Sequence, residues 1–223
     1  MLNNPILITG IQRSGSTIIT KVMASAGAWT GDCTNMLENI GLKKKLDSYY
    51  QNKLFVDKKG QYPMPNVDAL YSPFDWKEMI NTILVKQGFD LSTPWLLKDS
   101  RIGQTWPIWK KAYPDAKWLI VRRRSGDIIH SCMNTGYMCE YHKSSVLLKI
   151  GVASEYDGWK WWIQQQEENF IKLILSKADC QIIWPDRMQD GDFSQMAEVI
   201  EWAGLKWNDS IIPMVENMLH IKK

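Results

Sequence analysis

The first segment that could do chemistry combines glycines and hydroxyl side chains with one arginine, in the order Gly10-Ile11-Gln12-Arg13-Ser14-Gly15-Ser16-Thr17. It follows an apolar run, residues 5–9, and opens a stretch, residues 16–26, whose apolar residues recur at helical spacing. Glycines let several backbone N–H groups point at one anion, and a helix N-terminus adds partial positive charge. The segment predicts a phosphate-binding turn; a plain strand-to-helix connection is the alternative.

The spacing of this segment is close to that of the nucleotide-binding P-loop, GxxxxGK[ST]. Gly10, Gly15 and Thr17 match the pattern, but Ser16 stands in place of the lysine. NTP-hydrolysing enzymes use that lysine on the β- and γ-phosphates, beside a magnesium ion. We therefore expect the loop to bind an anion other than NTP·Mg²⁺, through a set of six residues: Gln12, Arg13, Ser14, Gly15, Ser16 and Thr17.

A second basic motif follows another apolar run, residues 117–121. Arg122, Arg123 and Arg124 precede a predicted helix over residues 126–134, and Ser131 lies about two turns along that helix. An arginine offers a planar, always charged fork of donors to a phosphate. A solvated basic cluster at a strand end is the alternative for this motif alone. Beside the first loop, it predicts a second anion site.

Together these motifs resemble those of the PAPS-dependent sulfotransferase family, in its bacterial and Golgi-type form. Residues 5–23 resemble the loop that binds the 5′-phosphosulfate, with Arg13 as its basic residue. Arg123 and Ser131, eight residues apart with Asp127 between them, resemble the 3′-phosphate motif. The resemblance implies a three-layer, P-loop-like α/β fold with a central parallel sheet flanked by helices, and a donor, PAPS (3′-phosphoadenosine 5′-phosphosulfate), released as PAP.

The segment Trp95-Leu96-Leu97-Lys98-Asp99-Ser100-Arg101 resembles the Lys-Asp-Pro-Arg segment of the family, with serine in place of proline. The resemblance implies that Lys98 lies near the transferred group, and we assign charge neutralisation to Lys98 and Arg13. An ion pair among Lys98, Asp99 and Arg101 is the alternative.

A general base must accept the acceptor's proton. We expect Glu38 in this role, which makes Arg13, Lys98 and Glu38 the predicted catalytic residues; His130 and His142 are the other candidates. Trp184-Pro185-Asp186 departs from the family's Tyr-Glu-Asp, and no C-terminal Arg-Lys-Gly element is found. The residues that contact adenine therefore stay open.

The elements that position these residues alternate between strand and helix, which predicts a parallel sheet covered on both faces, with ligands at the carboxyl ends of its strands. Strands are expected at residues 5–9, 95–98, 117–121 and 181–184. Helices are expected at residues 16–26, 75–87, 103–112, 126–134, 155–176, 193–203 and 210–219, with Asp75 as an N-cap, and in part of residues 35–50. Residues 54–76 are rich in proline, glycine and aromatic residues, and predict a loop or a lid over the acceptor.

The composition indicates one globular domain over residues 1–223, with 45% hydrophobic and 23% charged residues. The net charge is +3, and the basic residues form one cluster rather than an extended stripe, which argues against nucleic acid. The cysteines and histidines lack zinc-like spacing, so no metal is expected. Free thiols are expected, with a Cys33–Cys180 bridge as the alternative. No signal peptide or membrane-spanning run is found, so a cytoplasmic location is expected.

Tryptophan is abundant, with 12 copies. Core packing is the favoured interpretation, and stacking on adenine or on the acceptor is the alternative.

The function that best fits all these features is transfer of a sulfuryl group from PAPS to a hydroxyl or amine of a small-molecule, sugar or lipid acceptor, without a metal. A P-loop nucleotide kinase and a non-catalytic PAP- or nucleotide-binding module are the alternatives. The sequence does not predict the oligomeric state.

Overall fold

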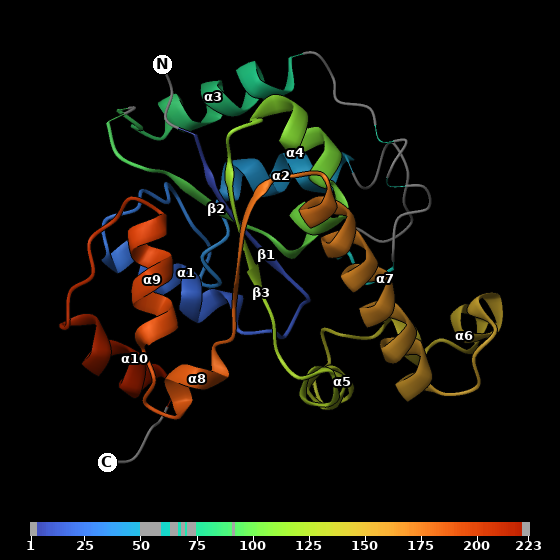
Figure 1. Ribbon diagram of the computed structural model, residues 1–223. Helices are drawn as coiled ribbons and strands as arrows, with labels where there is room; N and C mark the ends of the chain where they lie inside the picture. The colour runs from blue at the N-terminus through green and yellow to red at the C-terminus, as the bar shows by residue number, and fades with distance from the viewer. Residues whose placement is uncertain are drawn as a thin grey trace.

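A four-stranded parallel sheet forms the centre of the molecule in a computed structural model (Figure 1). The structure describes residues 4–49, 59–62, 67, 70, 75–90 and 92–219. The strand order is β2–β1–β3–β4, with bounds β1 Ile6–Gly10, β2 Leu96–Lys98, β3 Lys117–Val121 and β4 Asp179–Ile183. The predicted parallel α/β fold is confirmed. The first strand lies inside the sheet, paired with β2 on one side and β3 on the other.

Helices cover both faces of this sheet. One face is covered by α1 Ser16–Ser25, α8 Asp186–Gln189, α9 Ser194–Trp202 and α10 Ile211–Leu219. The other is covered by α2 Ile40–Tyr49, α3 Trp76–Lys86, α4 Trp106–Ala112, α5 Ser125–Met133 and α7 Glu155–Leu175. The short helix α6 Ser144–Ile150 lies outside α7 (Figure 1). This arrangement gives the three layers that the sequence predicts.

Strand alternation divides the core into two clusters. Leu7 and Trp118 face the α7 side, while Ile8 and Leu119 face the α1 side. Successive side chains of a strand point to opposite faces, so each strand contributes to both clusters. The α7-side cluster holds most of the buried indoles, among them Trp159. Core packing is therefore confirmed for five almost completely buried tryptophans: Trp95, Trp109, Trp118, Trp159 and Trp162.

The element between β2 and β3 differs from its prediction. The expected helix over residues 103–112 is instead a 3₁₀ turn, Ser100–Gln104, followed by α4. Asp99 caps the turn by accepting a hydrogen bond from the Arg101 N–H, and Pro107 occupies the first turn of α4, where a missing N–H costs nothing. Asp75 is the N-cap residue of α3, as predicted, although its side chain makes no capping hydrogen bond.

Three short elements were not predicted: α6, α8 and the 3₁₀ turn Glu140–His142. Each is shorter than the window over which helical periodicity can be measured.

The four cysteines are free thiols, so the Cys33–Cys180 bridge is absent. Within the described residues, no helix is long and apolar enough to cross a membrane. Most of the predicted lid, residues 54–76, lies outside the described residues; the lid and the single-domain boundary stay predictions.

Candidate functional site

The turn after β1 is shaped by close packing against β3. A Cβ atom at Gly10 would lie 2.5 Å from the Val121 carbonyl oxygen, so only glycine fits there. Arg13 and Gly15 both adopt left-handed conformations, with φ of 73° and 91°. Gly15 precedes α1 and offers no side-chain cap. The first N–H groups of α1 have no acceptor within the helix and are available to an anion.

The two predicted anion motifs meet at the carboxyl ends of β1 and β3. Arg13 donates from Nε to Oγ of Ser131, at 2.9 Å, and a terminal nitrogen of Arg123 donates to the Arg13 carbonyl oxygen, at 3.2 Å. The Nε atom of Arg123 also lies 3.9 Å from a carboxylate oxygen of Asp186 in α8. Two guanidinium groups and a hydroxyl from motifs about 110 residues apart therefore share one location.

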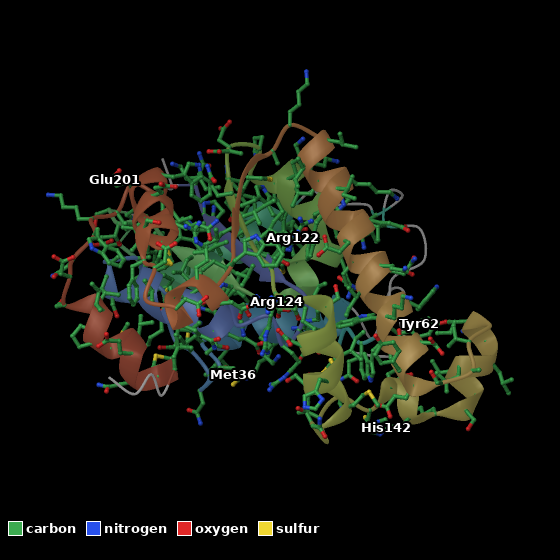
Figure 2. All side chains as sticks on the ribbon, turned by 60° about the horizontal axis from the view of Figure 1, so that its bottom comes forward. Met36, Tyr62, Arg122, Arg124, His142 and Glu201 are labelled. Atoms are coloured by element: carbon green, nitrogen blue, oxygen red, sulfur yellow. The ribbon has the colours of Figure 1, made fainter. Side chains whose placement is uncertain are left out.

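The three arginines after β3 take different directions. Arg122 pairs with Glu167 of α7, and Arg124 is exposed. Burial raises the pKa of the Glu167 carboxyl, and the neighbouring Arg122 charge opposes this effect. Of these three arginines, Arg123 is the one that donates a hydrogen bond to the turn after β1, at the Arg13 carbonyl oxygen. Arg123, the arginine that the family resemblance selects, is thus the one that contacts this turn, and its role in binding stays a prediction. Figure 2 shows Arg122 and Arg124 at separate positions along this segment.

The side chains of the turn after β1 differ in whether their polar atoms have hydrogen-bond partners among the described residues. The Ser14 hydroxyl is buried and has no hydrogen-bond partner among the described residues. Gln12 donates from Nε2 to the Lys59 carbonyl oxygen, whereas its buried Oε1 lacks a partner in the same described set. Buried polar groups are normally hydrogen-bonded. Ser14 is therefore a group that fits an anion held in the turn.

The two remaining predicted catalytic residues contact each other at the end of β2. Nζ of Lys98 lies 3.3 Å from Oε1 of Glu38 and donates to the Met36 carbonyl oxygen at 3.1 Å. Nζ of Lys43, from α2, lies 2.7 Å from the other carboxylate oxygen of Glu38. Lys98 is buried, and Glu38 is partly exposed. Sequence reasoning missed Lys43, because nothing distinguishes it from Lys44 and Lys45 beside it.

The alternative strand-end ion pair is present between Asp99 and Arg101, but Lys98 pairs with Glu38 instead of joining it. Arg101 donates from Nε and a terminal nitrogen to the two oxygens of Asp99, at 2.9 and 2.6 Å, and its other terminal nitrogen pairs with Asp47. Burial opposes ionisation of Asp99, but the charge and hydrogen bonds of Arg101 outweigh it and lower the pKa of Asp99. This arrangement fixes the end of β2 against α2.

The two histidines considered as bases make local contacts. His142 lies 2.7 Å from Glu155 of α7, and His130 contacts Asn134 one turn along α5. Figure 2 shows His142 near the α6 side of the molecule and Met36, whose carbonyl accepts from Lys98, nearer to α10. Of the three candidates, the structure brings Glu38 to Lys98. In the part of the chain that the structure describes, no group of three or more Asp, Glu, His or Cys side chains could hold a metal ion.

The glycine-containing turn after β1 and the hydrogen bond between Arg13 and Ser131 lie at the carboxyl edge of a parallel sheet covered by helices, which is the fold of a P-loop-like α/β protein. Residues 5–209 match the model of the Sulfotransferase family, and the chain belongs to that family. Family membership and fold support sulfuryl transfer as its general activity. No curated protein sequence matches this chain significantly.

Two solved structures are similar in fold. Sulfotransferase STF9 from Mycobacterium avium aligns with a TM-score of 0.61 at 12% identity, covering 99% of this chain and 68% of that one. Sulfotransferase STF1 from Mycobacterium tuberculosis H37Rv aligns with a TM-score of 0.54 at 14% identity, covering 98% of this chain and 77% of that one. At these identities the likeness establishes the fold alone.

Proposed function

We propose that this protein transfers the sulfuryl group of PAPS to a hydroxyl or amine of an acceptor and releases PAP. The observation that carries the proposal is the cluster of Arg13, Arg123 and Ser131, which joins the two anion motifs. PAPS carries anionic groups at its 5′ and 3′ positions, so a protein that binds it needs two anion sites within the reach of one nucleotide. Family membership supports sulfuryl transfer, and the cluster supports this particular donor.

The residues present suit this donor. The N–H groups at the start of α1, with the hydroxyls of Ser14, Ser16 and Thr17, would hold its 5′ end, and the partnerless Ser14 hydroxyl supports this assignment. Arg123 and Ser131 would hold the 3′-phosphate. The donor supplies the sulfuryl group and a phosphate that can leave.

Three side chains then have distinct tasks. Lys98 and Arg13 stabilise the negative charge that develops on the leaving phosphate, and as fixed cations they need little reorganisation. Glu38 accepts the proton that the acceptor loses as its oxygen or nitrogen bonds to sulfur. Lys98 and Lys43 hold the two carboxylate oxygens of Glu38 and so orient it.

Thermal unfolding with and without PAP tests the donor. A ligand at 100 times its Kd stabilises the folded state by about 2.7 kcal/mol, which raises Tm by about 5–10 °C for a chain of this size. Arg123→Ala should abolish most of this shift, whereas Arg124→Ala should retain it, because Arg124 is the exposed member of the same cluster. The two variants lose the same charge, so the pair separates a specific contact from general electrostatics.

Two further measurements separate the rival functions. A Tm shift with ATP·Mg²⁺ and none with PAP would replace this proposal with a nucleotide kinase. PAP release from PAPS in the presence of an acceptor panel distinguishes an enzyme from a binding module that shares the same anion contacts. Glu38→Gln should keep the PAP shift and lower turnover by about 10²- to 10⁴-fold, as for loss of a general base.

A further inference from the structure

A groove of about 530 Å³ adjoins the proposed active site. Three segments line it: α1 contributes Thr17 and Lys21, the turn at residues 34–38 contributes Asn35 and Leu37, and α10 contributes Met214, Asn217 and Met218. Its volume lies within the range of small-molecule sites. Thr17 belongs both to the groove and to the anion-binding turn, so the groove reaches the place where the donor's 5′ end is proposed to bind.

The turn at residues 34–38 links the groove to the catalytic carboxylate. Leu37 has a left-handed backbone, with φ of 57°, which is rare for a residue other than glycine. The turn is closed by bonds from the Leu37 N–H to the Thr34 carbonyl oxygen and from the Thr34 N–H to the Glu38 carbonyl oxygen. One turn therefore places Leu37 on the groove and Glu38 against Lys98. Strained backbone of this kind often accompanies functional sites.

The lining has a mixed but definite chemistry. Leu37, Met214 and Met218 are apolar, and the flexible, polarisable thioethers adapt to apolar bodies of varied shape. Met36, beside the groove residues in the turn, is 51% exposed and lies on the face that comes forward in Figure 2. Lys21 is the one charged side chain among the lining residues that the structure describes, and no carboxylate is among them.

A sugar presents hydroxyls on most of its surface and needs many matched polar partners, whereas the neutral polar side chains of the lining are only Thr17, Asn35 and Asn217. The lining suits an apolar body with few polar groups, one of them anionic. We propose that the groove binds the acceptor, and that the acceptor is a hydroxyl compound with an apolar ring or chain and an anionic group that pairs with Lys21. This inference rests on the proposed function. In the reaction, the hydroxyl proton passes to Glu38, the oxygen bonds to sulfur, and PAP leaves with the electrons of the broken bond.

Three probe acceptors test this inference with PAPS as donor: 6-hydroxy-2-naphthoate, 2-naphthol and glucose. We expect kcat/KM to fall in that order. Lys21→Gln should lower kcat/KM for 6-hydroxy-2-naphthoate by about fivefold, the upper range for a solvent-accessible ion pair, and leave 2-naphthol unchanged. Lys160→Gln removes an exposed lysine from α7 and should change neither value.

Binding provides a readout that does not need turnover. Fluorescence anisotropy of 6-hydroxy-2-naphthoate with the PAP-bound protein should give a Kd that rises by at least about tenfold in Met218→Glu, because a like charge then faces the anionic ligand. Met218 is 41% exposed, so the variant should fold, and its PAP-induced Tm shift checks this. Leu148→Glu, on α6, makes the same kind of change outside the groove and should leave the Kd unchanged.

The outcomes separate the two proposals. If PAP binds but glucose is the best acceptor, or if Lys21→Gln and Met218→Glu leave the naphthoate constants unchanged, the groove is not the acceptor site while the donor assignment stands. If PAP neither binds nor is released, the proposed function fails and this inference fails with it.

Discussion

Two neighbouring residues at the end of β2 lead to two charge clusters of opposite composition. Lys98 belongs to a cluster with two cations and one anion, Lys98–Glu38–Lys43. Asp99 belongs to a cluster with two anions and one cation, Asp99–Arg101–Asp47. Both clusters connect the strand end to α2 or to the segment just before it. Each cluster has one exposed end, since the side chain of Lys43 is 34% exposed and that of Asp47 is 33% exposed. The central pairs differ: Asp99 and Arg101 are each 3% exposed, whereas Glu38 is 20% exposed beside Lys98 at 6%.

We propose that the Asp99 cluster is structural and that the Lys98 cluster takes part in the reaction. The Arg101 fork is saturated by two carboxylates, so it has little capacity for a ligand. The Lys98 cluster carries an excess positive charge beside the proposed donor site and opens to solvent through Glu38 and Lys43. The cluster with excess positive charge can therefore respond to an anionic substrate, whereas the buried Asp99–Arg101 pair holds the fold.

The largest expected effect is on stability, in Arg101→Met. Removing this guanidinium leaves the buried Asp99 carboxylate uncompensated, which costs about 3–5 kcal/mol in the free energy of unfolding. Urea denaturation followed by far-UV circular dichroism measures this loss. Arg187→Met, which breaks an exposed pair with Asp192, is the matched control and should leave the free energy of unfolding nearly unchanged. Equal losses in both variants would remove the distinction between the clusters.

The next effect is on catalysis, in Lys98→Met. This change keeps the length of the side chain and leaves Glu38 paired with Lys43. Because a preorganised cation at the leaving group is lost, kcat should fall by about 10²- to 10³-fold. The PAP-induced Tm shift should persist. If Lys98→Met lowered the free energy of unfolding as much as Arg101→Met while activity survived, the role of Lys98 would be to stabilise the fold and not to catalyse the reaction.

Lys43→Met should give a smaller change in rate. Glu38 keeps its contact with Lys98, so it loses one of two partners and part of its orientation. Because the lost partner is partly exposed, we expect kcat/KM to fall by about fivefold with unchanged stability. Steady-state kinetics with PAPS and a good acceptor measures this, and Lys44→Met on the same helix is the control. An effect as large as that of Lys98→Met would mean that the two lysines act equally.

The last expected effect is on the pH dependence of stability, through the carboxyl of Asp99. Its folded-state pKa is lowered, so its contribution to stability is fully present above the unfolded pKa of about 3.9 and is lost as pH falls through the folded value. The difference in unfolding free energy between the wild type and Asp99→Asn should therefore be constant from pH 7 to about 5 and narrow below pH 4. A difference that grew with falling pH would contradict the sign of the pKa change.

The elements that could be predicted from sequence were those with a strong local signal. The buried strands β1 and β3 and the long helix α7 were predicted to within a residue or two, because the strands are short apolar runs and the helix is long and amphipathic. Strand β4 begins two residues before its prediction, since its exposed positions carry the polar residues Asp179 and Gln181. As an edge strand it is covered less completely than β1, and its pattern is weaker.

The separate motifs of the candidate site could be predicted from the sequence, but the contacts between their side chains could not. The anion motifs were visible because glycine, serine and arginine spacings are local. The contacts of Lys98 with Glu38 and of Arg13 with Ser131 join residues 60 and 118 positions apart, and no local pattern contains them. The groove between α1 and α10 depends on how two helices pack, and so could not be predicted from either helix alone.

The position of β1 inside the sheet has a consequence for synthesis of the chain. Ile6 pairs with Leu96 on one side and Lys117 on the other, so the first strand has no sheet neighbour until about 90 further residues have been made, and its second neighbour comes later still. At ribosomal rates of about 5–20 residues per second, this wait lasts roughly 5–20 seconds. During that time a fully apolar segment lacks its native partners. We expect the nascent chain to depend on chaperones that hold exposed apolar segments, and a truncated chain ending before β3 to aggregate.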